Sequence, residues 1–302
     1  MAKPVYEPRL TPGMAAGKGA SRVLQAKVAN VRKHAPQAML SDVEAIHDMR
    51  VAVKRLRETM RLFRRLLPRR RRDAIMPVVE MLNDTLGAVR ERDVMILDAE
   101  KLVGEVGDGG GLCALAVAQW RTDRALAFEH LVGMWARTCS EGLFQALDEL
   151  AVRTARRRRV ANRAPLERFV YRAVTRALER VHQRLQPALA SSDPAPMHRL
   201  RIAVKRLRYS TEPFRELLPA LVEPCKLTAQ AQELLGLTHD LDVLRDALAA
   251  HLDEVEPGRR EAAQGVLATL EVRRQESAQR AHEAAEQLAD PGFGRAVLDA
   301  ID

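Results

Sequence analysis

The chain has 302 residues, of which 47% are hydrophobic, 29% are charged and only 4% are aromatic. Its 49 Lys and Arg exceed its 40 Asp and Glu, a formal net charge of +9. Such a charge favours an anionic partner without naming one, and it is equally expected for any soluble protein from an arginine-rich proteome. Neither a signal-peptide pattern nor a run of about 20 apolar residues occurs, which predicts a cytoplasmic protein with no membrane partner.

The three cysteines, Cys113, Cys139 and Cys225, are far apart and odd in number. No two of them have the spacing of zinc ligands. They are typical of buried thiols in a reducing compartment rather than of a disulfide-stapled fold.

The predicted elements are helical throughout. Residues 1–19 are rich in Pro and Gly and are expected to be poorly ordered. The first clear helical period covers 41–67, with Ser41 or Asp42 as N-cap and Glu44 completing a capping box with Ser41. Further helical segments are predicted at 73–102, 112–152, 165–189, 197–218, 224–252 and 258–288. About four helices per half, without an alternating strand pattern, indicate an all-α fold of two helical bundles.

An internal repeat organises the chain. Residues 47–68 read HDMRVAVKRLRETMRLFRRLLP, and residues 198–219 read HRLRIAVKRLRYSTEPFRELLP. At nearly the same offset, LGAVRERDV at 86–94 matches LGLTHDLDV at 235–243. We interpret the matches as a duplicated unit, with a first repeat over 20–155 and a second over 156–302.

Each repeat carries two parallel stripes at helical spacing. The apolar stripes, which must face a core, contain Ile46, Met49, Val53, Leu56, Met60, Phe63 and Leu67, and in the second repeat Met197, Leu200, Val204, Leu207, Phe214 and Leu218. One residue further on, the first basic row contains His47, Arg50, Lys54, Arg57, Arg61 and Arg64, and the second basic row contains His198, Arg201, Lys205, Arg208 and Arg215.

Three positions qualify this pattern. Glu212 interrupts the second basic row where the first repeat has Arg61. Arg55 and Arg206 lie on the far side of the histidines, where they either widen the rows or point to solvent.

Rows of like charge weaken a helix by a few tenths of a kcal/mol per pair, so they need an explanation. From residue 47 to residue 61 the helix rises about 21 Å, at about 1.5 Å per residue, which suits a linear anion better than a single phosphate. Arg presents a planar fork to phosphate oxygens, Lys a compact charge, and His a donor that titrates near neutrality. The alternative is a solvated basic face, but a solvated face does not require the same register in both repeats.

The second motif has a structural interpretation. Asp93 and Asp242 occupy matching positions and are expected to anchor neighbouring arginines or helix ends. His239, Asp240 and Asp242 lack an established ligand spacing, so no metal and no cofactor is predicted. The run Arg69–Arg72 is expected to complement a helix C-terminus, and the row Arg172, Arg176, Arg180 and Arg184 to be an exposed face.

Signatures of catalysis are missing from the sequence. It has no Walker loop, no GxGxxG and no GxSxG, and no pair of carboxylates stands out for acid–base chemistry. The few aromatic residues are not interleaved with the basic rows, which argues against a stacking platform for single-stranded nucleic acid. We therefore expect a binding protein rather than an enzyme.

The paired H-x-x-R-[VI]-A-V-K-R-L-R…F-R-x-L-L-P segments, each followed by LG…DV, resemble the CHAD family, the conserved histidine α-helical domain. The resemblance covers about residues 20–290. It implies two antiparallel helical bundles related by a pseudo-twofold axis, a central basic groove or pore, and binding of inorganic polyphosphate without catalysis. The implied groove residues are His47, Arg50, Lys54, Arg57 and Arg61, with His198, Arg201, Lys205 and Arg208.

Some relatives are fused to a triphosphate-tunnel catalytic domain marked by a Glu-x-Glu-x-Lys strand. That strand is not found here, so we expect a stand-alone form. His239 stands where the family commonly has Arg. The predicted function is non-enzymatic polyphosphate binding, compatible with targeting to polyphosphate granules in the cytoplasm. The alternatives are a helical nucleic-acid-binding protein and an enzyme acting on phosphate polymers.

Overall fold

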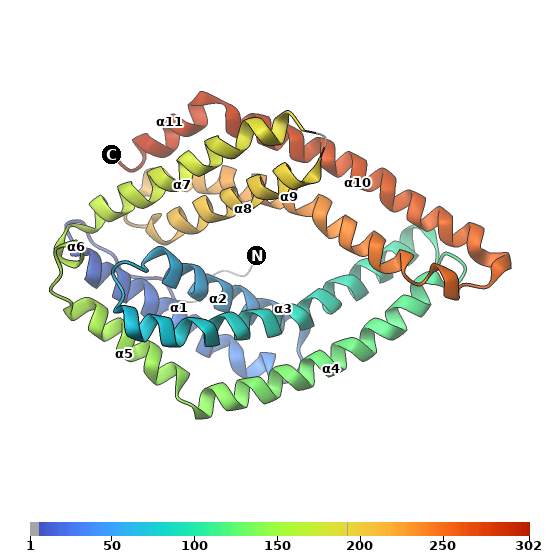
Figure 1. The fold of residues 1–302 in the computed structure, drawn as a ribbon, viewed down its shortest axis with the longest axis horizontal. Helices are drawn as coiled ribbons and strands as arrows, with labels where there is room; N and C mark the ends of the chain where they lie inside the picture. The colour runs from blue at the N-terminus through green and yellow to red at the C-terminus, as the bar shows by residue number, and fades with distance from the viewer. Residues whose placement is uncertain (1–5, 192) are drawn as a thin grey trace.

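The computed structural model describes residues 6–191 and 193–302, which are almost entirely helical. Two lobes lie side by side in Figure 1, α1–α5 forming one and α7–α11 the other, with the short α6 between them. The helices are α1 Ala16–Ala38, α2 Val43–Leu62, α3 Arg69–Val106, α4 Leu112–Ser140, α5 Leu143–Arg156, α6 Val160–Arg163, α7 Leu166–Leu189, α8 Pro194–Thr211, α9 Val222–Ala249, α10 Arg260–Ala289 and α11 Pro291–Asp299. This confirms the predicted all-α class.

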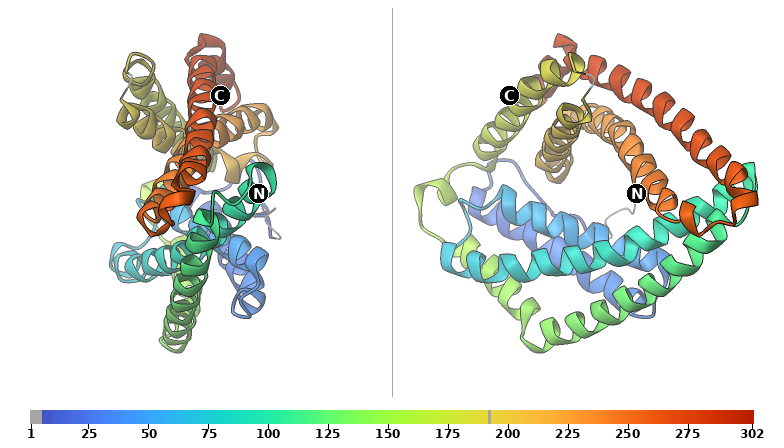
Figure 2. Two further views of the ribbon diagram at one scale, coloured as in Figure 1. Left: turned by 90° about the vertical axis from the view of Figure 1, so that its right-hand side faces the viewer. Right: turned by 45° about the vertical axis from the view of Figure 1, so that its right-hand side comes forward.

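Helices pack in the same order in both lobes. In the first, α1 packs on α2, α2 on α3 and α3 on α4; in the second, α7 packs on α8, α8 on α9 and α9 on α10. The views in Figures 1 and 2 agree that α4 and α10 lie on the outside, whereas α2, α3, α8 and α9 face the middle of the molecule. The helices that carry the repeated motifs are therefore the inner ones.

The apolar stripes form the core, as predicted. The α2 members Ile46, Met49, Val53 and Met60 are completely buried. On α8, the side chains of Leu200, Val204 and Leu207 are buried too. Because successive helical residues are about 100° apart, burial of these stripes fixes the direction of the basic rows next to them.

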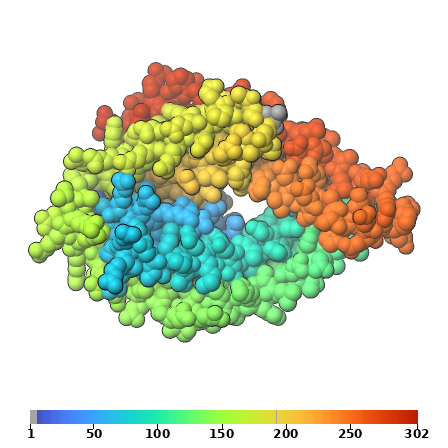
Figure 3. Space-filling model, in the orientation of Figure 1, coloured from blue at the N-terminus to red at the C-terminus, as the bar shows by residue number. Residues whose placement is uncertain are grey.

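The lobes are joined at both ends. Near α6, the buried ring of Phe63 stacks on Phe169 at 5.0 Å and meets Phe214 edge-on at 6.1 Å. At the other end a separate core joins Ile96 and Leu102 of α3 with Leu244 and Leu248 of α9. Figure 3 shows an opening through the molecule between these two junctions. The surface of the inner helices is thus exposed to solvent inside a closed ring.

A glycine loop contributes to the second junction. Gly110 has φ of +66°, and a Cβ there would lie 2.7 Å from Cβ of Arg259. Only glycine allows both this backbone and this approach of the loop after α3 to the turn before α10. Helix α3 continues to Val106, four residues beyond its predicted end at residue 102.

Two details of the helix predictions are wrong. Asp42 caps α2, its carboxylate accepting the Ala45 N–H at 2.7 Å, while Ser41 has φ of +65° and forms no capping box with Glu44. The predicted helix 112–152 is two helices, because Gly142 adopts a left-handed conformation between α4 and α5. Both corrections concern the backbone conformation of turns, which the spacing of apolar residues does not predict.

The N-terminal prediction is also wrong where the structure tests it, and residues 1–5 lie outside the described residues. Helix α1, which the periodicity analysis missed, begins at Ala16 and packs on α2 and α5. Before it, the Tyr6 backbone exchanges hydrogen bonds with the Asn30 side chain, and Leu166 N–H donates to Met14 O at 2.7 Å. Tertiary hydrogen bonds therefore order a segment whose composition suggests a tail.

The cysteines differ in environment: Cys113 is buried, Cys225 is partly buried and Cys139 is exposed. The expectation of buried thiols is thus wrong for Cys139. None of the helices in residues 6–191 and 193–302 has both the length and the apolar character of a membrane span.

Candidate anion-binding site

Lys54 lies where the two basic rows approach each other. It is on the inner helix α2, in the electrostatic field of Arg50 and Arg57 from its own row and of Lys205 and Arg201 from α8. Partial burial, reinforced by these four cations, lowers the pKa of Lys54 to about 7. The pKa of this lysine therefore reports burial first and, second, a local excess of positive charge contributed by both helices.

Two glycines lie against the central arginines. A Cβ at Gly87 of α3 would lie 3.9 Å from Nε of Arg50, and one at Gly236 of α9 would lie 3.8 Å from Nε of Arg201. Each guanidinium therefore packs over the glycine of the LG motif in the same repeat. Distances of 3.8–3.9 Å are ordinary van der Waals contacts, so an alanine would still fit under each arginine, whereas a larger side chain would displace it.

The histidines begin the rows. Burial, and secondarily Arg90, lower the pKa of His47. Burial, Arg201 and His239 lower that of His198, whose ring centroid lies 5.8 Å from that of His239. Both imidazoles are therefore mainly neutral at pH 7 until an anion supplies countercharge.

Arg90 is a further member of the site that the sequence analysis did not assign. It follows the LG motif on α3 and acts electrostatically on both His47 and Arg50. Its Nη1 atom is buried without a hydrogen-bond partner among the described residues. A buried, unsatisfied donor carries a free-energy cost that a bound acceptor would remove.

The central cations have few acidic neighbours. Among the residues that the structure describes, Arg50, Lys54, Arg201 and Lys205 form no ion pair within 4.0 Å and no side-chain hydrogen bond. Three carboxylates act on them electrostatically without pairing: Glu91 and Asp240 on Arg50, and Glu58 on Lys205. Burial raises the pKa of Asp240, although Arg201 and other cations oppose the shift. The centre of the site thus keeps a net positive charge.

Arg57 and Arg61 are partly neutralised by Glu58. Arg57 donates to Glu58 at 2.9 Å, and Arg61 donates to Glu58 at 3.1 Å and to Glu80 at 2.6 Å. Arg57 is largely buried, whereas 45% of the Arg61 side chain is exposed. These carboxylates, which were not assigned from the sequence, divide the first basic row into an unpaired part at Arg50 and Lys54 and a paired part at Arg57 and Arg61.

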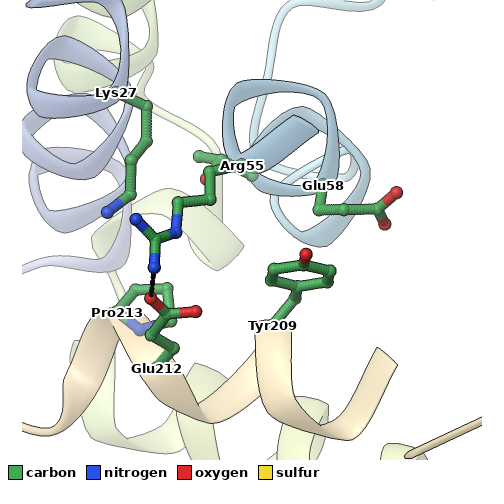
Figure 4. A pocket seen from close by; sticks show the side chains of 7 residues that line it. Lys27, Arg55, Glu58, Tyr209, Glu212 and Pro213 are labelled. Atoms are coloured by element: carbon green, nitrogen blue, oxygen red, sulfur yellow. Dashed lines mark ion pairs between the residues drawn. The ribbon is translucent and has the colours of Figure 1, made fainter. Parts of the chain in front are cut away.

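Arg55 is part of a contact between the lobes. It forms a 2.6 Å ion pair with Glu212, and both side chains are at least 87% buried. Figure 4 shows the amino group of Lys27, from α1, beside this pair. Burial lowers the pKa of Lys27, although Glu212 opposes the shift. The interruption of the second basic row at Glu212 therefore has a structural explanation: this carboxylate binds an arginine of the other lobe.

The two remaining predicted residues differ in exposure. Arg206 is exposed to solvent, whereas Arg208 is only 7% exposed. Because Arg55 and Arg208 are buried, they are better placed to support the fold than to contact a polymer. For both, direct binding stays a prediction.

The matching aspartates hold arginines on the outer helices. Asp93 is buried and pairs with Arg124 of α4, which also donates to Ser41 Oγ at 2.8 Å. Asp242 lies 3.8 Å from Arg274 of α10. This agrees with the predicted anchoring role. No group of three or more His, Cys, Asp or Glu side chains in the described part of the chain is arranged to hold a metal ion.

Comparison with known proteins places this arrangement in a family. Residues 22–249 match the profile of the CHAD domain, and the chain therefore belongs to the CHAD domain family. No curated protein matches it in sequence.

Two solved structures are similar in fold. One is the CHAD domain from the plant Ricinus communis, with a TM-score of 0.65 and 24% identity over 98% of this chain and 96% of that one. The other is PptA from Streptomyces chartreusis, with a TM-score of 0.61 and 18% identity over 91% of this chain and 99% of that one.

Proposed function

We propose that the protein binds inorganic polyphosphate in a central basic groove between the two basic rows, without catalysing its hydrolysis. The observation that carries the proposal is the convergence of unpaired cations from α2 and α8 around Lys54. Membership of the CHAD family, which is linked in general to polyphosphate binding, supports the same ligand.

We also infer that the lobes are copies of one unit, with a boundary near residue 156, the last residue of α5. Equivalent contacts support this inference. Arg50 over Gly87 corresponds to Arg201 over Gly236. In addition, the repeat-related rings of Phe63 and Phe214 meet each other where the lobes join. A pseudo-twofold relation of this kind brings two rows with the same sequence to opposite sides of one path.

The physical role of the polymer is to supply missing countercharge. Phosphate oxygens would accept charge-assisted hydrogen bonds from Arg50, Arg201 and the unsatisfied Nη1 of Arg90. They would also raise the depressed pKa of Lys54. Because binding displaces counterions from a dense polyanion, affinity should fall steeply with salt.

Removing Arg50 and Arg201 together tests the proposal. Charge-assisted bonds contribute about 1.5–3 kcal/mol each, so the Arg50→Ala, Arg201→Ala variant should bind long-chain polyphosphate at least about 100-fold more weakly in calorimetric titration. The matched control is Arg176→Ala with Arg180→Ala, which removes two exposed arginines of α7 and should change affinity only a few-fold. Wild-type affinity in the first variant, with helicity unchanged, would defeat the proposal.

The alternative functions have their own tests. Competition between polyphosphate and DNA or RNA at fixed salt distinguishes a polyphosphate binder from a nucleic-acid binder. Incubation of the protein with polyphosphate and a divalent metal, followed by measurement of released phosphate, tests for an enzyme. Preferential displacement by nucleic acid, or steady release of phosphate, would favour the corresponding alternative.

A further inference from the structure

A second basic feature lies beyond the end of α2. An open hollow of about 750 Å³ is lined by the end of α2, the start of α3 and the segment that follows α5. Its volume is within the range of ligand sites, about 300–1,000 Å³. We call it the arginine hollow, because its walls include Arg61, Arg64, Arg65, Arg69, Arg157 and Arg159.

The local structure places these arginines around a helix start. Arg69–Arg72 form the first turn of α3, which contains no acidic residue. Arg69 pairs with Asp73 and Arg71 with Glu149, so the expectation that this run complements a helix C-terminus is wrong for these two residues. Arg72 alone reaches back, donating to Arg64 O at 2.6 Å. Cations at a helix N-terminus oppose the helix dipole, whereas an anion there is stabilised by it.

The hollow is poor in countercharge. Asp73 is the one carboxylate among its lining residues, and it pairs with Arg72 at 2.6 Å and with Arg69 at 3.5 Å. Arg61 pairs with Glu58 and Glu80 outside the lining. Arg157 donates to the Leu67 carbonyl at 2.8 Å. The side chains of Arg64, Arg65 and Arg159 form no hydrogen bond or ion pair with any residue that the structure describes.

The second repeat has no counterpart to this hollow. Residues 64–73 read RRLLPRRRRD, whereas the matching residues 215–224 read RELLPALVEP. Arg215, the equivalent of Arg64, pairs with Glu7 at 3.1 Å, and Glu216 replaces Arg65. An excess of arginine at one end only is not explained by the duplication.

We propose that the arginine hollow is a second phosphate site, which receives the part of a long polyphosphate chain that extends past the central groove. The inference rests on the proposed function. Arg61 belongs both to the first basic row and to the wall of the hollow, so it would carry one continuous path between the two sites, past the Glu58 and Glu80 carboxylates with which it pairs. About 10 Å of helix separates Lys54 from Arg61, at about 1.5 Å per residue. A long chain reaches both sites, whereas triphosphate bound at Lys54 does not.

The test compares chain lengths in calorimetric titrations over a range of salt concentrations. In the Arg64→Gln, Arg65→Gln, Arg159→Gln variant, affinity for long-chain polyphosphate should fall at least about ten-fold. The log–log salt slope should become smaller by about 2, at about 0.7 per lost phosphate contact. Triphosphate affinity should stay within two-fold of wild type. The control removes the same charge from exposed positions on α7, with Arg172→Gln, Arg176→Gln and Arg180→Gln.

The outcomes separate this inference from the proposed function. Unchanged long-chain affinity in the hollow variant, or an equal fall in the α7 control, would overturn the second site alone. If the wild type binds two triphosphate molecules and the hollow variant binds only one, the hollow is an independent site, and the continuous path is overturned. Wild-type affinity in the Arg50→Ala, Arg201→Ala variant would instead remove the proposed function, and the second site with it.

Discussion

The depressed pKa of Lys54 predicts that polyphosphate binding takes up protons. In the free protein, burial and the surrounding cations hold the pKa of Lys54 at about 7. A polyanion beside the amine reverses the electrostatic part of this shift and moves the pKa back toward its ordinary value, about 10.4. Above pH 7 the free protein therefore loses a charge that the complex keeps.

The magnitude follows from proton linkage. With a pKa of about 7, roughly half of the free protein carries a charged Lys54 at pH 7, but only about one molecule in 100 does at pH 9. If the complex keeps Lys54 protonated throughout, affinity falls by about 50-fold between these pH values, or about 2 kcal/mol. Near pH 8 each binding event should take up about 0.9 proton at this residue.

Other groups have limited influence in this window. The pKa values of His47 and His198 lie below 6.5, so both are already neutral above pH 7. Burial also lowers the pKa of Lys205, but that residue is unchanged in the variants compared. A long polyphosphate chain has few terminal groups, so titration of the ligand contributes little.

The assay is calorimetric titration at pH 6, 7, 8 and 9 in buffers of different ionisation enthalpy, which reports affinity and proton uptake together. Lys54→Arg should retain its affinity at pH 9, because arginine stays protonated. Lys54→Met should bind more weakly at pH 6 and lose affinity less steeply above pH 7. Lys226→Arg, at an exposed residue paired with Glu223, should behave as wild type. Identical pH profiles in wild type and both Lys54 variants would refute the reasoning.

Two further predictions concern the contacts that shape the site. Arg55→Ala or Glu212→Ala alone should lower the free energy of unfolding by about 3 kcal/mol, because each breaks a buried ion pair of 2.6 Å. In chemical denaturation the double variant should lose at least about 1 kcal/mol less than the sum, and strict additivity would show that the pair is not coupled. Gly87→Ala should preserve polyphosphate affinity and stabilise α3 by up to about 1 kcal/mol. Gly87→Leu should weaken binding by displacing Arg50. Equal affinity in both glycine variants would show that contact with Gly87 does not position Arg50 for binding.

The charge distribution explains why the repeats are not interchangeable. Glu212 stands where the first repeat has Arg61, and it joins the lobes through Arg55 instead of extending the second row. At the equivalent position of the first repeat, Arg61 pairs with Glu58 and Glu80 and lines the arginine hollow. The two ends of the proposed path therefore differ in charge, which would give a bound chain an uneven distribution of contacts.

The sequence alone determined the helical class, the core faces and the register of the basic rows, because side-chain spacing along a helix is a local property. The sequence predicts that the apolar stripe of α2 faces the core, and the burial of Ile46, Met49 and Val53 confirms it. The direction of the first basic row follows from that burial. Helix α1 was missed because it is ordered by tertiary packing and hydrogen bonds, despite the Pro- and Gly-rich composition before it.

Tertiary structure alone decided which charges act together. The position of Glu212 in the sequence does not reveal that it pairs with Arg55 of the other lobe, and the LG motif does not reveal that its glycines lie against Arg50 and Arg201. Lys54 has its depressed pKa because a second helix, some 150 residues away in sequence, brings Arg201 and Lys205 into its field. Electrostatic interaction and desolvation depend on distance and burial in space, and neither is encoded in the period of a single helix.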